Sequence, residues 1–458
     1  METQAPVNTP KEPISPVAFP PGLGSAFVFA TFNALSFQMI LNSPMVLYAK
    51  NLDASATVLG IVAGMMPLLV IFQIPAANHI ARVGYKKFVY AGWGTRVMFI
   101  FGMALVPLTG GFLNHTSQLA LILFLLFGFN LSRGISSAAW LPWITALVPL
   151  EIRGQYLARE AACVHVASCT TLLLAAACLG QEPHSWQFAV LFGFSAVAGA
   201  ISLFFLKRIP DAEPPEKQVV SKEPVPWRAI ASYKPFRKLL RMNAAWSVAY
   251  GGINAFTVAY LKVEAGMSEG SILIVTGLAF LGGLAGLGYF ESRTDRLGSK
   301  PVVAFCLSIW MLIMVGWLLF GARVVAPRVG LVLPLELLMG FAYALVSMNN
   351  TRLAMVLAPM MGRSHFFALY SVVANLTLGL APVFWGLLID AFGPREFHWR
   401  GFELNRFSFF FLCVFSIFAL ALILCRKLDE PKARNVDELI AELLQSPQRL
   451  WLRLWPRG

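Results

Sequence analysis

The sequence predicts an all-α integral membrane protein with twelve transmembrane helices in two pseudo-symmetric six-helix bundles. Composition, long apolar runs and an internal repeat lead to this prediction. The 458 residues are 57% hydrophobic and only 13% charged, whereas soluble domains carry roughly a quarter charged residues. Six cysteines in so long a chain argue against a disulfide scaffold, and the apolar content argues against disorder. So apolar a chain is not expected to bind nucleic acid, despite its net charge of +13.

Twelve segments are long and apolar enough to cross a bilayer, since a spanning helix needs about 20 mostly apolar residues. The apolar runs are continuous and lack two-residue alternation, so we expect helices rather than barrel strands. The predicted spans are residues 24–48, 55–78, 87–108, 117–146, 156–180, 186–206, 242–262, 270–290, 301–321, 329–357, 364–390 and 405–425. All six cysteines fall within or at the ends of spans and show no disulfide or metal-ligand spacing, so no metal site is expected.

Polar segments divide the chain into five parts. They are a Pro-rich tail (1–23), a first bundle (24–206), a linker (207–241), a second bundle (242–425) and a tail (426–458) with a candidate amphipathic helix. Lys and Arg favour cytoplasmic segments, and the linker and the C-terminal tail are rich in both. We therefore expect both termini in the cytoplasm, in a multi-pass protein of the cytoplasmic (inner) membrane that contacts membrane lipid.

The second half of the chain repeats the first at an offset of about 210 residues. Pro149 and Arg153 follow the fourth span, and Pro359 and Arg363 follow the tenth. Paired basic loops follow spans two and eight. Their residues are Arg82, Gly84 and Lys86 in the first loop and Asp295, Arg296, Gly298 and Lys300 in the second. The interpretation is a six-helix unit duplicated in parallel orientation.

With these features the chain resembles the major facilitator superfamily of secondary transporters. That family carries a Gly-x-x-x-Asp-Arg-x-Gly-Arg-Arg-like signature between spans two and three and a degenerate copy between spans eight and nine. The second copy matches better here, through Asp295, Arg296, Gly298 and Lys300. Glu291 takes its leading glycine position, while the first copy has Ala77 and Ala81 where Gly and Asp are usual. The resemblance implies an alternating-access transporter of a small solute, not an enzyme, with no cofactor.

The resemblance also implies that these loops gate the cytoplasmic side. Gly84 and Gly298 permit tight turns between antiparallel helices. Asp295 can accept hydrogen bonds from helix N-terminal amides and from neighbouring basic side chains. The simpler alternative is that these charges only fix topology. Arg153 and Arg363 are expected to hold the inner ends of spans four and ten, with lipid phosphate contact as the alternative.

Polar side chains within spans are predicted to line a central cavity between the halves, because polar groups are costly in hydrocarbon. Spans four and ten each carry a polar stripe, and the stripes superpose under the 210-residue offset. The candidate substrate-binding residues are Asn130, Arg133, Ser137 and Trp140 in span four, Tyr343, Ser347 and Asn350 in span ten, Tyr250 and Asn254 in span seven, and Asn375 in span eleven. Polar packing between helices is the alternative for any single residue.

Charged residues within spans suggest the chemistry of the substrate. Arg133 lies near the middle of span four and favours an anionic, carboxylate-bearing substrate, because a guanidinium pairs bidentately with a carboxylate. Neutralisation by a protein carboxylate is the alternative. His165 and Glu336 are the candidates for proton coupling, although His165 also fits a core histidine.

The expected transport mode is symport or uniport. The Gly-Pro signature of the family's antiporters is missing from residues 160–180, which disfavours drug or metabolite efflux without excluding it. A lipid flippase or a transceptor on the same fold is a further alternative. The expected partners are a small-molecule solute and a co-transported proton or sodium ion, and a monomer is expected.

Overall fold

The structure is a computed structural model that describes residues 22–148, 153–181, 183–212, 232–357, 363–399, 401–430 and 438. The structural statements that follow concern these residues. Most of the predicted N-terminal tail and linker, and the candidate amphipathic helix of the C-terminal tail, lie outside them.

The N-terminal half contains helices only. They are α1 (Gly24–Leu41), α2 (Ser43–Asn51), α3 (Ala56–Leu69), η1 (Val70–Phe72), α4 (Gln73–Val83), α5 (Tyr85–Leu105), η2 (Val106–Gly111), α6 (His115–Ser136), η3 (Ser137–Ala139), α7 (Trp140–Leu147), α8 (Arg153–Leu179) and α9 (Ser185–Arg208). Pro67 lies inside α3, where its missing N–H and its ring disturb the helical ladder. The 3₁₀ turn η1 begins three residues later.

The C-terminal half repeats this pattern and adds a hairpin. Its elements are α11 (Lys234–Tyr250), α12 (Ile253–Val263), α13 (Glu269–Leu297), α14 (Ser299–Gly321), α15 (Val329–Leu357), α16 (Arg363–Phe392), β1 (Phe397–Trp399), β2 (Phe402–Leu404) and α17 (Arg406–Arg426). The strands are antiparallel, with His398 opposite Glu403.

Eleven helices of the described chain are long and apolar enough to cross a membrane, and they match eleven of the predicted spans. The predicted seventh span, 242–262, is present as two shorter helices, because α11 ends at Tyr250 and α12 begins at Ile253. Gly252 has a left-handed backbone with φ of 94°, and a Cβ there would lie 2.9 Å from the Phe256 ring. A left-handed residue ends a helix, and glycine fits both constraints. Together α11 and α12 occupy the seventh position of an all-α fold.

The internal repeat extends to backbone conformation. Asn42, which separates α1 from α2, has an extended backbone, and it lies 210 residues before Gly252. Gly84 and Gly298 end α4 and α13 with φ of 87° and 91°, and each is followed at once by the next helix. The predicted duplication therefore reproduces the helix breaks and tight turns as well as the spans.

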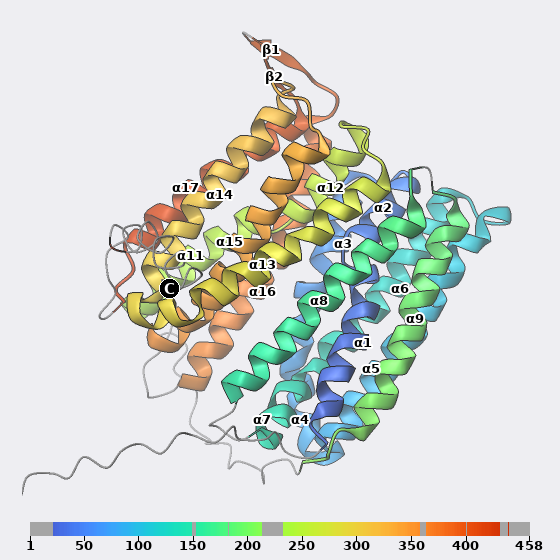
Figure 1. The fold of residues 1–458 in the computed structure, drawn as a ribbon, viewed down its shortest axis with the longest axis vertical. Coiled ribbons are helices and arrows are strands. Elements are labelled where there is room, and N and C mark those ends of the chain that lie inside the picture. Colours follow the sequence, from blue (N-terminus) through green and yellow to red (C-terminus); the bar gives the residue numbers. More distant parts are fainter. Residues whose placement is uncertain are drawn as a thin grey trace, which may run out of the picture.

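The helices run side by side along the molecule, with the loops gathered at its two ends (Figure 1). We call the end that carries the hairpin β1–β2 and the α2–α3 turn the distal end. The opposite end, which carries α4 and α7, is the proximal end. Between the halves, α3 packs against α16 and α8 packs against α13.

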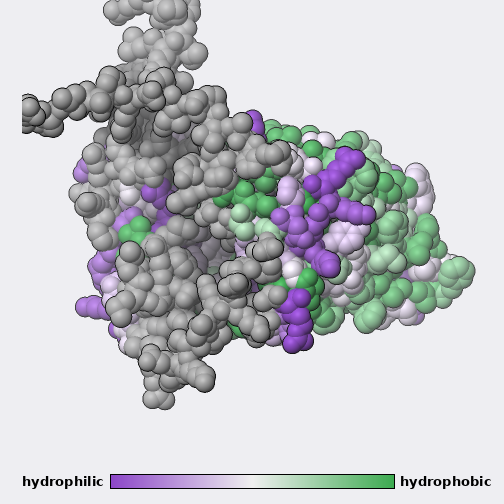
Figure 2. All heavy atoms as spheres, turned by 90° about the horizontal axis from the view of Figure 1, so that it is seen from below, coloured by the Kyte–Doolittle hydropathy of each residue, from purple (hydrophilic) through white to green (hydrophobic). Residues whose placement is uncertain are grey.

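The outer surface has the polarity of a membrane protein. Large apolar side chains such as Met98, Phe124 and Leu312 are each more than 60% exposed, as expected for helix faces that contact lipid. Viewed from the proximal end, hydrophilic side chains gather beside a broad hydrophobic flank (Figure 2). Exposed basic residues at this end of the N-terminal half include Lys87, Lys207 and Arg208.

Candidate functional site

A cavity of about 420 Å³ lies between the two halves, lined by helices from both. This volume is within the range of ligand pockets, roughly 300–1,000 Å³. The charged and titratable residues that line it are Arg133, His165, Tyr250, Glu336 and Tyr343. All five were predicted from sequence as substrate-binding or proton-coupling candidates.

The distal wall of the cavity is held by hydrogen bonds at the two helix breaks. The Asn254 Nδ2 donates to the Asn42 Oδ1 at 3.2 Å, which joins the α11–α12 break to the α1–α2 break. Asn42 in turn donates to Gln38, and the Gln38 Nε2 donates to the Ser168 Oγ at 2.5 Å. This network links α12, α1 and α8, so it couples the two halves at the cavity wall.

A second pair of contacts fastens the halves at the distal end. The Asp390 carboxylate accepts hydrogen bonds from the Ala56 N–H at 3.1 Å and the Thr57 N–H at 2.7 Å, the first amides of α3. It also accepts from the Thr57 hydroxyl at 2.6 Å. At the position 210 residues earlier, the Gly180 carbonyl accepts from the Gly270 N–H at 2.8 Å, near the start of α13. We call these two contacts the distal latch.

Hydrogen bonds between the halves are found among the described residues at the cavity wall and at the distal latch. The two halves are therefore fastened on the distal side of the cavity.

Arg133 lacks a protein counter-ion among the described residues. It lines the cavity on α6, is partly buried, and no described side chain forms a hydrogen bond or an ion pair with it. A guanidinium in a low-dielectric site needs a partner, because desolvation otherwise costs several kcal/mol. The described residues thus supply no carboxylate to Arg133, and its pairing with a substrate anion stays a prediction.

Arg96 is the contrasting case on the neighbouring helix. It is 1% exposed, donates to the Asn33 Oδ1, and lies with its Cζ 4.9 Å from the Trp93 ring centroid, although its Nε has no partner among the described residues. An aromatic face and an amide oxygen can hold a buried guanidinium in place. Arg96 does not line the cavity, so its role is packing between α1 and α5.

Glu336 and an aromatic cluster form the opposite wall, in the C-terminal half. Glu336 is 2% exposed, and its Oε1 has no hydrogen-bond partner among the described residues. The Tyr250 and Tyr343 rings are stacked with centroids 4.6 Å apart, and Trp310 meets Tyr250 edge-on at 5.7 Å. The cavity therefore has a basic side chain on the wall of the N-terminal half and an acidic side chain with aromatic rings on the wall of the C-terminal half.

His165 stands at the junction of the halves. Its Nδ1 is 2.9 Å from the Ala161 carbonyl, and its ring meets Phe280 of the other half edge-on with centroids 5.9 Å apart. The carbonyl contact fits a proton on Nδ1, which leaves Nε2 as an acceptor. Proton coupling through His165 stays a prediction.

The other candidate side chains lie elsewhere. Asn130 donates to the Leu126 carbonyl of its own helix, and Ser137 accepts from Gln73. Trp140 packs against Phe29. The helical stripe predicted for span four breaks because α6 ends at Ser136 and η3 changes the phase of the residues that follow.

Spans ten and eleven divide in a similar way. Glu336 and Tyr343 line the cavity, whereas Ser347 and Asn350, further along α15, do not. Asn375 lines a separate groove of about 260 Å³ between the α3–η1 segment and α16. Asn254 is the remaining candidate that lines the cavity. Gln38 and Asn42 of α1 and the α1–α2 break also line the cavity.

The basic loops at the proximal end are described only in part. Arg82 is exposed and Lys86 is half-buried. Arg153 and Arg363 are the first residues of α8 and α16, the equivalent positions that the repeat predicts. Their side chains and those of Asp295 and Arg296 lie outside the described set, so their gating roles stay predictions.

Glu430, and not the predicted Asp295, is the described acid that caps the N-terminus of α14 after the α13–α14 loop. The Glu430 carboxylate, beyond α17, accepts hydrogen bonds from the Ser299 N–H at 3.0 Å and the Lys300 N–H at 2.7 Å. The Lys300 ammonium donates to the Leu428 carbonyl at 2.8 Å. These contacts join the end of α17 to the start of α14, and Asp295 had been predicted for such a role.

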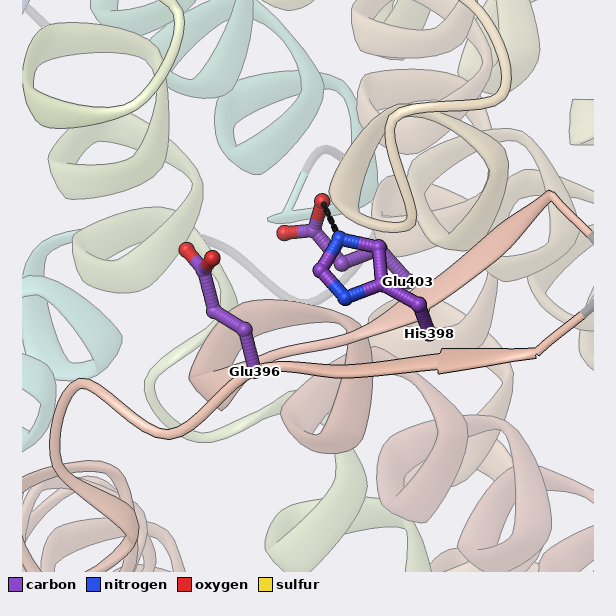
Figure 3. Close-up of side chains that lie close together, drawn as sticks. All are labelled: Glu396, His398 and Glu403. Carbon is purple, nitrogen blue, oxygen red and sulfur yellow. Dashed lines mark ion pairs between the residues drawn. The ribbon is translucent and has the colours of Figure 1, made fainter.

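A cluster of ligand-type side chains, Glu396, His398 and Glu403, lies on the distal hairpin (Figure 3). The Arg323 guanidinium is 3.0 Å from a Glu403 oxygen and 3.4 Å from a Glu396 oxygen. Burial lowers the pKa of Arg323, but these carboxylates and Glu264 raise it by more, so the net shift is upward. Both acids thus pair with a cation of the protein, and the cluster fits an ion-pair network that fastens the hairpin.

About twelve membrane-spanning helices, in two repeated halves around a solute-sized cavity, define a multi-pass membrane transporter. The sequence profile of the Major Facilitator Superfamily matches residues 26–360 and 256–457. The chain belongs to this family, whose members transport small solutes and are generally not enzymes.

Solved structures show the same fold. A D-xylose–proton symporter is 14% identical, with 90% of this chain and 99% of that chain covered and a TM-score of 0.69. A mutant of the nucleoside transporter NupG is 11% identical, with 89% and 100% covered and a TM-score of 0.69. An inward-facing, unoccupied bacterial homologue of the human lysosomal transporter Spinster is 13% identical, with 89% and 97% covered and a TM-score of 0.63.

Sequence relatives match over a shorter stretch. The Autophagy-related protein 22-1 of Aspergillus clavatus is 25% identical over 235 residues, which cover 48% of this chain and 36% of that protein. The Autophagy-related protein 22-2 of Aspergillus fumigatus is 25% identical over 239 residues, with 49% and 36% covered. The match spans little more than a third of each relative.

Proposed function

We propose that this chain is an alternating-access symporter or uniporter whose substrate carries a carboxylate or similar anionic group bound by Arg133. The observation that carries the proposal is a cavity-lining guanidinium with no described protein counter-ion. A carboxylate accepts two parallel hydrogen bonds from a guanidinium and provides the negative charge that the described residues do not place beside Arg133.

The contacts between the halves support the alternating-access part of the proposal. In the described state the halves are fastened at the distal latch. Transport to the other side requires the distal latch to open. The latch consists of a few hydrogen bonds near the surface, each of which contributes only about 0.5–1.5 kcal/mol net, so substrate binding energy is sufficient to shift the balance.

Coupling and location belong to the same proposal. His165 and Glu336 both line the cavity and are proposed as the proton-coupling candidates, and one structural neighbour is named a proton symporter. The basic proximal surface is proposed to face the cytoplasm, in the cytoplasmic membrane. The relatives named as autophagy-related proteins make an internal membrane the alternative.

A lipid flippase is the second candidate function. The groove between the α3–η1 segment and α16 supports it, because it shares the lining residue Pro67 with the central cavity and is lined mostly by apolar residues such as Leu68, Ile71 and Leu376. A polar headgroup would need a polar path, and only a few polar side chains, including Gln73 and Asn375, line this groove. The anion-binding cavity therefore favours the solute transporter.

The test is a thermal-shift screen of purified protein against carboxylates, sugars, amino acids and peptides, followed by uptake of the best ligand into proteoliposomes. Arg133→Gln is expected to remove both the stabilisation by carboxylate-bearing ligands and the uptake. Arg328→Gln, on an exposed distal loop, is the matched control and is expected to retain both. Normal uptake by the Arg133→Gln protein, or stabilisation only by neutral sugars, would contradict the anion model.

A further inference from the structure

The wall of the cavity opposite Arg133 carries an acid that the carboxylate site does not use. Glu336 lies on α15 of the C-terminal half, two residues after Pro334, and its buried Oε1 has no partner among the described residues. No described Lys or Arg forms an ion pair with it. A carboxylate desolvated without a partner is as costly as a guanidinium in the same position. The cavity thus holds two uncompensated groups of opposite sign, one from each half.

The surroundings of Glu336 are those that recognise an organic cation. Tyr250 is stacked between Trp246 and Tyr343, which leaves the outer face of Tyr343 as the free face of this stack. Tyr250 and Tyr343 line the same cavity as Glu336. Aromatic faces attract ammonium groups through the ring quadrupole, and the attraction grows when water is excluded. A carboxylate beside such faces provides both hydrogen-bond acceptors and charge for an alkylammonium.

The Trp310 indole of this wall also carries an unpartnered polar atom. Its Nε1–H is buried and has no acceptor among the described residues, although an indole N–H can only donate. Buried polar atoms without partners are uncommon in folded proteins. Here an unpartnered donor, Trp310, and an unpartnered acceptor, Glu336, line one cavity.

We propose that the substrate is dipolar, with a carboxylate bound by Arg133 and an ammonium group bound by Glu336 and the outer aromatic face of Tyr343. This inference rests on the proposed transport function and names the class of substrate within it. A dipolar solute neutralises both walls at once, whereas a simple anion leaves Glu336 desolvated and a simple amine leaves Arg133 desolvated. The two charges lie on different halves, so such a solute also draws the halves together.

The size of the cavity suits a small member of this class. About 420 Å³ accommodates an amino acid or a short peptide, and the stacked tyrosines offer a flat apolar surface to a side chain. The polar groups of the distal wall, Asn42 and Asn254, bond to each other across the halves. The charged recognition therefore falls to Arg133 and Glu336.

The test uses three probes of one shape: phenylalanine, 3-phenylpropanoate, which lacks the ammonium group, and 2-phenylethylamine, which lacks the carboxylate. Glycine and a dialanine peptide provide smaller and larger dipolar probes. Binding is measured by thermal shift and by isothermal titration on the full-length wild-type protein, Glu336→Gln and Arg133→Gln. Glu396→Gln, on the exposed hairpin, is the matched control. Glu336→Asp, which keeps the charge, is the second variant in case Glu336→Gln does not fold.

The expected result is that one or more dipolar probes bind wild type at least about tenfold more tightly than the probes that lack one charge. The reason is that a desolvated charge left unpaired lowers the affinity at least about tenfold. Glu336→Gln is expected to abolish the advantage over 3-phenylpropanoate, and Arg133→Gln the advantage over 2-phenylethylamine. Glu336→Asp and Glu396→Gln are expected to keep both advantages.

Two other outcomes separate this inference from the proposed function. Equal binding of 3-phenylpropanoate and phenylalanine, with no effect of Glu336→Gln, overturns the dipolar substrate and leaves the anion transporter intact. That pattern is expected if Glu336 carries a proton instead. Full binding of carboxylate probes by Arg133→Gln overturns both proposals. Failure of every dipolar probe to bind wild type overturns the dipolar substrate.

Discussion

The distal latch allows a quantitative test of alternating access. The change is Asp390→Asn, which keeps the size of the side chain but removes its charge and one of its two acceptor oxygens. In the structure the Asp390 carboxylate accepts three hydrogen bonds, two from the first amides of α3 and one from the Thr57 hydroxyl. The variant can keep at most part of this set, because an amide nitrogen cannot accept from an N–H.

The magnitude follows from these contacts. Net hydrogen bonds to charged groups contribute roughly 1.5–3 kcal/mol when buried, but Asp390 is exposed and solvent screening reduces the effect. We therefore expect a loss of about 1–2 kcal/mol from the state closed at the distal end, which changes the ratio of closed to open molecules about 5- to 30-fold. Only contacts between the halves are affected, so the fold should be retained.

The assay is a distance distribution between spin labels on the two halves at the distal end, for example at Thr116 and Arg328, in a background without the native cysteines. Asp390→Asn is expected to increase the population with long distances. Asp53→Asn is the control, because Asp53 pairs with His115 within the N-terminal half. A change in population of less than twofold for Asp390→Asn, or an equal change for the control, would refute the latch.

Two further predictions concern close approach and helix capping. Gly60→Ala places a Cβ 2.2 Å from the Pro382 carbonyl oxygen of the other half, so this variant is expected to lengthen the distal distances in the same assay. Gly94→Ala, with no atom within 4 Å of the new Cβ, is the control and should leave the distances unchanged. Identical distributions for both variants would show that the α3–α16 contact is not tight. Glu430→Gln weakens the cap of α14 and is expected to lower the free energy of unfolding by about 1 kcal/mol, measured as a lower Tm. Asp429→Asn, which affects a surface contact to Lys238, is the control. An equal or larger loss of stability in Asp429→Asn would contradict the role of Glu430.

The sequence predicted the class of fold because the bilayer imposes simple rules. Every backbone group in hydrocarbon must be satisfied within the segment, so long apolar runs can only be helices. Eleven predicted spans are single spans in the structure. The 210-residue repeat indicated the two halves, and equivalent positions such as Gly84 and Gly298 share a backbone conformation. Arg133, Tyr250, Glu336 and Tyr343 were predicted from polarity alone and line the cavity.

The remaining features depended on packing that no local pattern encodes. The helix break at Gly252 comes from the left-handed backbone of this residue, which packs against Pro382 of α16. In the sequence, the adjacent glycines 251 and 252 are equally compatible with a helix break and with a close contact between helices. Ser137 and Trp140 do not lie on the predicted polar face of span four, because the 3₁₀ turn η3 changes the helical phase after Ser136. The distal latch joins Asp390 to Thr57 across more than 300 residues of sequence. Apolar periodicity is a local property and fixes the spans. Arg133 and Glu336, in contrast, come to line one cavity only when the two halves pack together.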